Sequence, residues 1–117
     1  MEKWVNAWNG HDLKTVLSMY SDRVEFTSPK IKVVLPHWKS SKINNKGDLE
    51  RYWAKALENF PNLHFTPKDI MFQKKVCVFE YYVTLDGKSK TSVMEKFEFQ
   101  DGLIIKSSVF YGSEEPV

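Results

Sequence analysis

The chain has 117 residues, which is enough for one compact domain with one hydrophobic core and too few for a second domain. Its 17 basic and 15 acidic residues are dispersed and leave a net charge of +2, so the composition does not indicate nucleic-acid binding. Hydrophobic residues make up 42% and charged residues 27%, as in ordinary globular proteins, and no apolar run approaches the length of a membrane span.

Cysteine and histidine usage limits the kinds of site that the chain can build. Cys77 is the only cysteine, so the chain forms neither an internal disulfide nor a cysteine-based zinc site. His11, His37 and His64 show no metal-ligand spacing, and we expect no metal and no cofactor. The N-terminus lacks the apolar segment of a signal peptide, so we expect a cytoplasmic protein.

The N-terminal part predicts two short helices and one short strand. Apolar residues at helical spacing predict a first helix that contains Trp4 and Trp8, and a second helix over residues 11–20. Residues 24–27 then alternate between polar and apolar side chains and predict a short strand that ends before Pro29.

The middle of the chain predicts a long loop followed by the clearest helix. Residues 29–46 are polar and lysine-rich, which predicts an exposed connection with one irregular strand at residues 31–35. This loop would act as a lid only if His37 and Trp38 fold over a cavity. Residues 47–60 carry one apolar stripe and predict a helix that ends at Pro61. The stripe comprises Leu49, Tyr52, Trp53, Ala56, Leu57 and Phe60.

The second half of the chain predicts four successive strands, over residues 63–73, 75–86, 91–101 and 104–112. Asp-Gly pairs at 86–87 and 101–102 predict hairpin turns between the last three. The order of the elements predicts an α+β fold, in which about three helices pack on one face of a cone-like, curved antiparallel sheet.

Glu95 is the first candidate for a functional residue. Period-2 alternation places it on the same strand face as Val93 and Phe97, and a carboxylate on such a face is costly to bury. Burial would raise the pKa of this carboxyl group and make it an acid/base or a hydrogen-bond donor. The alternative is a structural polar group that a tyrosine hydroxyl, an indole N–H or a buried water satisfies.

Three segments of the chain resemble a known superfamily. WVNAWNGHDLKTVLSMYSDRVEFTSP, GDLERYWAKALENFPNLHF and EKFEFQDGLI are similar to the nuclear transport factor 2-like proteins, in particular the SnoaL-like group of small bacterial proteins. The resemblance covers nearly the whole chain and implies a single SnoaL-like domain over residues 1–117. This cystatin-like fold hosts isomerases, cyclases, epoxide hydrolases, dehydratases and proteins without known chemistry, so it implies a pocket rather than one reaction.

Ketosteroid isomerases of this superfamily allow a residue-by-residue comparison. The resemblance places their general base at Ser28, their oxyanion-hole tyrosine at Trp4 and their oxyanion-hole carboxylic acid at Glu95. Because a serine does not take that proton unaided and tryptophan has no hydroxyl, Glu95 alone keeps its chemical group. The aromatic wall of the pocket is kept, although Tyr20 and Trp53 also fit a purely structural core role. We expect the ligand to contact Trp8, Tyr20, Phe26, Trp53, Phe79, Tyr81, Phe97 and Tyr111.

Together these features predict a pocket for a small, largely apolar organic molecule. In the leading interpretation the protein is an isomerase or cyclase that acts on an apolar carbonyl compound, with Glu95 as the catalytic group. The alternatives are a non-catalytic ligand-binding module and a protein-interaction module. Epoxide hydrolysis is disfavoured, because it would need an arginine inside the cone, whereas Arg23 and Arg51 are predicted outside it.

The outer face of the predicted sheet indicates an assembly. Tyr82, Met94 and Phe110 alternate onto the side away from the helices, together with the charged residues Glu80 and Lys96. Such a mixed face fits an interface better than open water, so we predict a homodimer through this face. We expect neither a nucleic acid nor a membrane as a partner.

Overall fold

The computed structural model describes residues 1–117 and begins with two short helices. α1 (Glu2–Asn9) and α2 (Leu13–Leu17) confirm the two predicted helices, but α2 ends earlier than expected. Tyr20 is therefore not a helical residue, as the apolar spacing predicted, but the first residue of β1 (Tyr20–Thr27). Pairing with a distant strand explains this difference, because Tyr20 lies opposite Ile104 and the Ile104 N–H donates to the Met19 carbonyl at 2.9 Å.

The loop after β1 contains two elements that the sequence did not predict correctly. Instead of a strand at residues 31–35, the chain forms the one-turn helix α3 (Ile31–Val34). Ile31 and Val34 are both buried and lie three residues apart, a spacing that places them on one face of a helix but on opposite faces of a strand. β2 (Lys42–Ile43) follows and pairs with the end of β1, which buries Ile43.

α4 (Lys46–Asn59) confirms the helix predicted over residues 47–60. Asn45 caps it, since its side-chain oxygen accepts a hydrogen bond from the Asp48 N–H at 2.8 Å. The apolar stripe of α4 faces the core, and its buried residues are Leu49, Tyr52 and Trp53.

The second half of the chain forms the predicted strands β3 (His64–Gln73), β4 (Val76–Thr84), β5 (Ser89–Gln100) and β6 (Leu103–Pro116). The sheet order is β2-β1-β6-β5-β4-β3, so β3 to β6 form a meander. Asp101 and Gly102 both have positive φ angles, of 52° and 80°, which suits the tight turn between β5 and β6. All pairs are antiparallel except β1 with β6, which is parallel.

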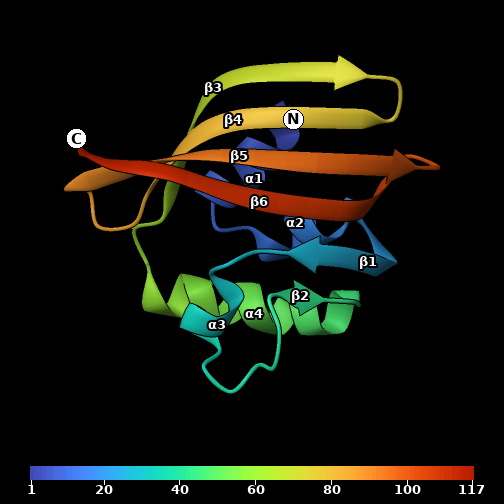
Figure 1. The fold of residues 1–117 in the computed structure, drawn as a ribbon, viewed down its shortest axis with the longest axis horizontal. Helices are drawn as coiled ribbons and strands as arrows, with labels where there is room; N and C mark the ends of the chain where they lie inside the picture. The colour runs from blue at the N-terminus through green and yellow to red at the C-terminus, as the bar shows by residue number, and fades with distance from the viewer.

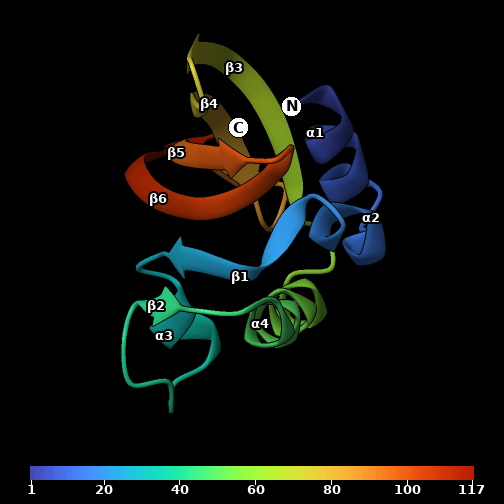
Figure 2. The same cartoon turned by 90° about the vertical axis from the view of Figure 1, so that its right-hand side faces the viewer.

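The α+β fold class is therefore confirmed. The sheet curves strongly, and α1, α2 and α4 lie on its concave face (Figures 1 and 2). Twenty-five buried hydrophobic residues from the helices and the sheet form one core cluster between them. None of the helices has the length and apolar character needed to cross a membrane.

Candidate functional site

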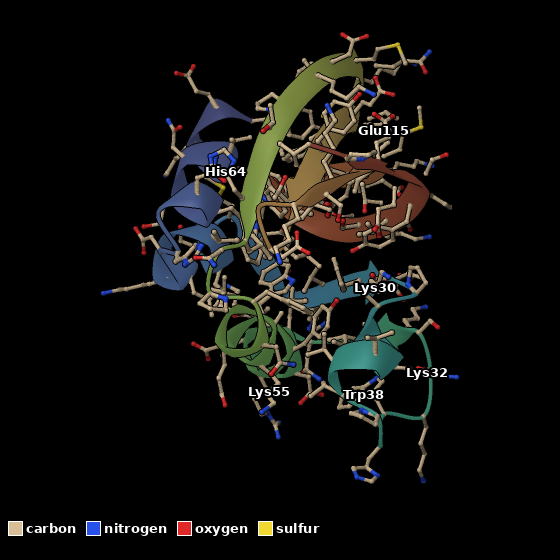
Figure 3. All side chains as sticks on the ribbon, turned by 90° about the vertical axis from the view of Figure 1, so that its left-hand side faces the viewer. Lys30, Lys32, Trp38, Lys55, His64 and Glu115 are labelled. Atoms are coloured by element: carbon tan, nitrogen blue, oxygen red, sulfur yellow. The ribbon has the colours of Figure 1, made fainter.

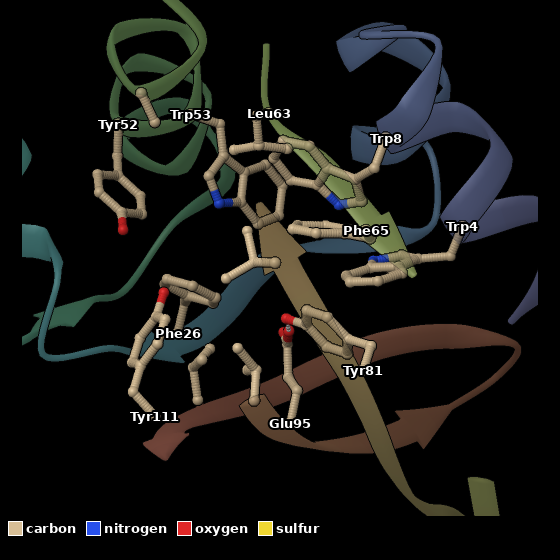
Figure 4. Close-up of a pocket in the computed structure, with 14 residues that line it drawn as sticks. Trp4, Trp8, Phe26, Tyr52, Trp53, Leu63, Phe65, Tyr81, Glu95 and Tyr111 are labelled. Carbon is tan, nitrogen blue, oxygen red and sulfur yellow. Dashed lines mark hydrogen bonds between the residues drawn. The ribbon is translucent and has the colours of Figure 1, made fainter. Parts of the chain in front are cut away.

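A cavity of about 80 Å³, here called the inner chamber, lies inside the core between the curved sheet and the helices α1 and α4 (Figure 4). Of its 14 lining residues, 13 are hydrophobic, and Glu95 is the exception. The lining consists of Trp4, Trp8, Phe26, Tyr52, Trp53, Ala56, Leu63, Phe65, Tyr81, Val83, Val93, Glu95, Val109 and Tyr111.

Glu95 lies in the middle of β5, and its side chain is only 3% exposed. One carboxyl oxygen, Oε1, accepts a hydrogen bond from the Tyr81 hydroxyl at 2.7 Å, and Oε2 accepts one from the Ser107 hydroxyl at 2.6 Å. Burial raises the pKa of Glu95 from 4.5 to about 7, although the hydrogen bonds from Ser107 and Tyr81 act in the opposite direction. The group therefore exists in both protonation states near neutral pH.

Strand register explains why these two hydroxyls reach Glu95. Glu95 lies opposite Phe79 on β4 and opposite Val109 on β6. Tyr81 and Ser107 each stand two residues from those partners, so both are diagonal neighbours of Glu95 on the same sheet face. No pattern in the sequence pointed to Ser107, because its role depends on the pairing of β5 with β6.

The aromatic walls come from elements that are far apart in the sequence. Trp53 on α4 meets Trp8 on α1 edge to face, with ring centroids 5.0 Å apart, and meets Phe26 on β1 at 5.6 Å. Trp4 stacks on Phe65 of β3 at 5.3 Å. These contacts join both helices to the sheet around the inner chamber.

Six of the nine site residues predicted from the sequence line the inner chamber, namely Trp8, Phe26, Trp53, Tyr81, Glu95 and Tyr111. Tyr20, Phe79 and Phe97 do not line it and belong to the surrounding core.

The indole of Trp4 contacts all three of these residues. Its Nε1 donates a hydrogen bond to the Tyr20 hydroxyl at 2.9 Å, and its ring packs against Phe79 and Phe97 at centroid distances of 5.9 and 5.4 Å. Trp4 itself lines the inner chamber, whereas the three residues that it contacts do not.

Tyr52, Phe65 and Trp4 are lining residues that were not among the predicted ligand contacts. Tyr52 lies on the apolar stripe of α4, and the alternation of β3 turns Phe65 inward while His64 stays exposed (Figure 3). The sequence thus carried a burial signal for both residues. It carried no signal that distinguished cavity lining from packed core.

A buried serine lies beside two of the lining tyrosines. Ser28, where the resemblance to the ketosteroid isomerases places their general base, is almost completely buried. Burial raises the pKa of the Tyr52 hydroxyl to about 12 and also raises that of Tyr111, while hydrogen bonding to Ser28 lowers both. These hydroxyls therefore stay protonated at neutral pH, which leaves Glu95 as the proton acceptor of the chamber.

A second cavity of about 160 Å³, the outer chamber, adjoins the first. The two chambers share five lining residues, Tyr52, Ala56, Leu63, Val83 and Tyr111. Lys30 and Glu114 are the charged residues of the outer chamber, and the Lys30 ammonium lies 5.2 Å from the centre of the Tyr111 ring. Tyr52 and Tyr111 thus stand in the wall between the chambers.

The loop of residues 29–46 does not cover the inner chamber with His37 or Trp38, as a lid would require. Trp38 lies beyond α3 (Figure 3), where its Nε1 donates a hydrogen bond to the Lys42 carbonyl at 2.9 Å. No three His, Cys, Asp or Glu side chains gather in a way that could hold a metal ion.

Comparison with known proteins decides the family. A model of the SnoaL-like domain matches residues 1–107. The chain belongs to the SnoaL-like family. A search of curated proteins finds none that matches this SnoaL-like chain.

Solved structures agree with this family. A SnoaL-like protein of unknown function from Burkholderia thailandensis is 29% identical, with a TM-score of 0.85 over 96% of this chain and 90% of that one. A candidate ketosteroid isomerase from Kribbella flavida is 16% identical, with a TM-score of 0.76 over 96% and 74%. IdmH, a candidate polyketide cyclase from Streptomyces antibioticus, is 14% identical, with a TM-score of 0.77 over 94% and 87%. At these last two identities the likeness shows the fold alone.

Proposed function

We propose that this SnoaL-like protein is a single domain that binds a small, apolar carbonyl compound in the inner chamber and acts on it as an isomerase or cyclase. The observation that carries the proposal is Glu95, a carboxyl group that is 3% exposed in an otherwise hydrophobic cavity and has a pKa of about 7. A general base or acid is most effective when its pKa lies near the working pH.

The proposed step is the transfer of one proton. The Glu95 carboxylate takes a proton from the carbon next to the ligand carbonyl, and the C–H electron pair moves into an enolate. The protonated Glu95 then returns this proton to the same or another carbon, which restores the carbonyl compound and the carboxylate. Tyr81 and Ser107 each donate to one oxygen of the carboxylate, and since each oxygen can accept two hydrogen bonds, one lone pair on each has no partner in the protein.

The size of the site favours a narrow ligand over a fused ring system. A dry cavity of about 150 Å³ binds benzene in another protein, and the inner chamber has about 80 Å³. A larger ligand would extend into the outer chamber past Tyr52 and Tyr111, with its reacting end at Glu95.

A second candidate function is non-catalytic binding of the same class of ligand. One observation favours it: both oxygens of Glu95 already have hydroxyl partners. The resemblance to the ketosteroid isomerases also puts a serine, Ser28, in the place of their general base. The fold also serves protein-interaction modules, which is the third alternative.

Deuterium exchange separates the first two functions. Butanone in D₂O should incorporate deuterium next to its carbonyl faster with the wild-type protein than without it, as followed by proton NMR. Glu95→Gln should abolish the acceleration. Glu98→Gln is the matched control, because Glu98 lies on the same strand but on the opposite face, and this variant should exchange like the wild type. Exchange by Glu95→Gln at the wild-type rate would contradict the proposal, and saturable binding without any exchange would favour the non-catalytic module.

A further inference from the structure

The indole N–H of Trp8 has no hydrogen-bond partner. It is the one buried side-chain nitrogen or oxygen in the structure without a partner, and the Trp8 side chain is only 4% exposed. Trp8 also lines the inner chamber. Buried polar groups are nearly always hydrogen-bonded, and leaving a donor unpaired costs free energy, so this exception calls for an explanation.

The surroundings of Trp8 explain why the protein itself supplies no acceptor. Its ring packs edge to face on Trp53 at 5.0 Å and lies 5.5 Å from Phe65, so aromatic carbon atoms form its immediate environment. By contrast, the indole of Trp4, one helical turn earlier, donates to the Tyr20 hydroxyl at 2.9 Å.

The free donor and the carboxyl group of Glu95 belong to the same chamber. Trp8 projects from α1 and Glu95 from β5, and Figure 4 shows them entering from opposite sides. Their chemistry is complementary, because an N–H can only donate whereas a carboxylate accepts.

We propose that Trp8 Nε1 donates a hydrogen bond to the carbonyl oxygen of the ligand in the inner chamber and thereby selects neutral ketones or aldehydes over hydrocarbons. This inference rests on the proposed function for the class of ligand. It adds the residue that recognises the oxygen and fixes the orientation, with the oxygen at Trp8 and a neighbouring carbon toward Glu95. An ionised ligand head is disfavoured, because the remaining lining is hydrophobic.

A matched pair of ligands tests the donor. Butanone and 2-methyl-1-butene have nearly the same shape, but only butanone has an acceptor oxygen. Water solvates butanone better than the alkene, so the readout is the ratio of the two affinities rather than either affinity alone. Trp8→Phe keeps an aromatic ring without the N–H, and it should lower the ratio of butanone affinity to alkene affinity about 2- to 10-fold, the usual contribution of one neutral hydrogen bond. Trp38→Phe is the control, since Trp38 lies outside both chambers, and it should keep the wild-type ratio.

The indole resonances of the wild-type protein give a second readout that does not depend on a variant. In a ¹⁵N–¹H spectrum, the Trp8 indole proton should move downfield with butanone and not with 2-methyl-1-butene, while the indole of Trp4 should stay in place. An affinity ratio that Trp8→Phe leaves at the wild-type value, or a Trp8 indole that does not respond to bound butanone, would overturn this inference and leave the proposed pocket intact. If neither ligand binds the wild-type protein saturably, the inference and the proposed function both fail.

Discussion

The Tyr81 hydroxyl donates a 2.7 Å hydrogen bond to Glu95 Oε1 from the diagonal position on the adjacent strand. This contact stabilises the ionised carboxylate in a cavity whose other lining residues are hydrophobic. Without such partners, burial would push the carboxyl group further toward its neutral form. The pair therefore sets how readily Glu95 gains and loses a proton near neutral pH.

Tyr81→Phe should raise the pKa of Glu95 above its value of about 7, because it removes a hydrogen bond that favours the charged form and leaves burial unchanged. The measurement is a carboxyl titration by ¹³C NMR. Tyr82→Phe is the matched control, since Tyr82 is the next residue of β4 and points to the outer face, where Lys68 and Lys90 lie over its ring. A pKa that stays constant or falls in Tyr81→Phe would contradict this role of Tyr81.

The titration of Glu95 should lower the free energy of unfolding as the pH rises from about 4.5 to about 7. The pKa of Glu95 is about 7 in the folded chain and 4.5 as its ordinary value, so the folded state binds more protons in this range. The contribution is fully present below pH 4.5 and is lost as the pH rises through 7, on the order of 3 kcal/mol in all.

Urea denaturation at pH 5 and pH 8 checks this linkage. The free energy of unfolding should decrease less between pH 5 and pH 8 in Glu95→Gln than in the wild type, because glutamine does not titrate. Glu98→Gln changes a residue on the outer face of β5 and should show the wild-type decrease. The prediction fails if both variants lose the same stability between the two pH values.

Much of this fold was predictable because its signals are local. The alternation along β4 and β5 and the Asp-Gly pairs between strands can each be read within a single segment. The alternation alone was enough to predict that Glu95 points inward. The errors arose where distant contacts decide the structure: Tyr20 joins β1 through its pairing with Ile104, and α3 replaces a strand because it buries Ile31.

The candidate site was harder to predict for the same reason. The role of Ser107 depends on the register of β5 with β6, and the free N–H of Trp8 depends on how α1 packs against α4. Trp4 lines the inner chamber and packs against Phe97, which does not line it, and no pattern within one segment contains that information.

Trp53→Ala should lower the free energy of unfolding by about 3–5 kcal/mol, the usual cost of removing a large buried aromatic side chain. Trp53 of α4 is buried and packs on Trp8 of α1 and on Tyr20 and Phe26 of β1. Chemical denaturation measures the effect, with Trp38→Ala as a control at a more exposed indole. An unchanged denaturation midpoint would show that the Trp53 ring does not hold these elements together.

Assembly through the outer sheet face remains a prediction with a direct test. Met94 and Phe110 face each other across β5 and β6, and they are 47% and 60% exposed. We expect a homodimer in sedimentation experiments at micromolar concentration and a monomer after Phe110→Asp, because a buried unpaired charge opposes association. Val33→Asp, which changes an exposed residue of α3, should stay dimeric. A wild-type protein that sediments only as a monomer would rule out this interface.

The central claim is that Glu95 is a desolvated acid/base inside a hydrophobic chamber, and its titration in the wild-type protein tests this claim most directly. ¹³C NMR of the side-chain carboxyl groups, assigned with Glu95→Gln, should give Glu95 a midpoint near pH 7. A midpoint near 4.5, its ordinary pKa, would mean that the group is solvated or charge-paired and would contradict the proposed proton transfer.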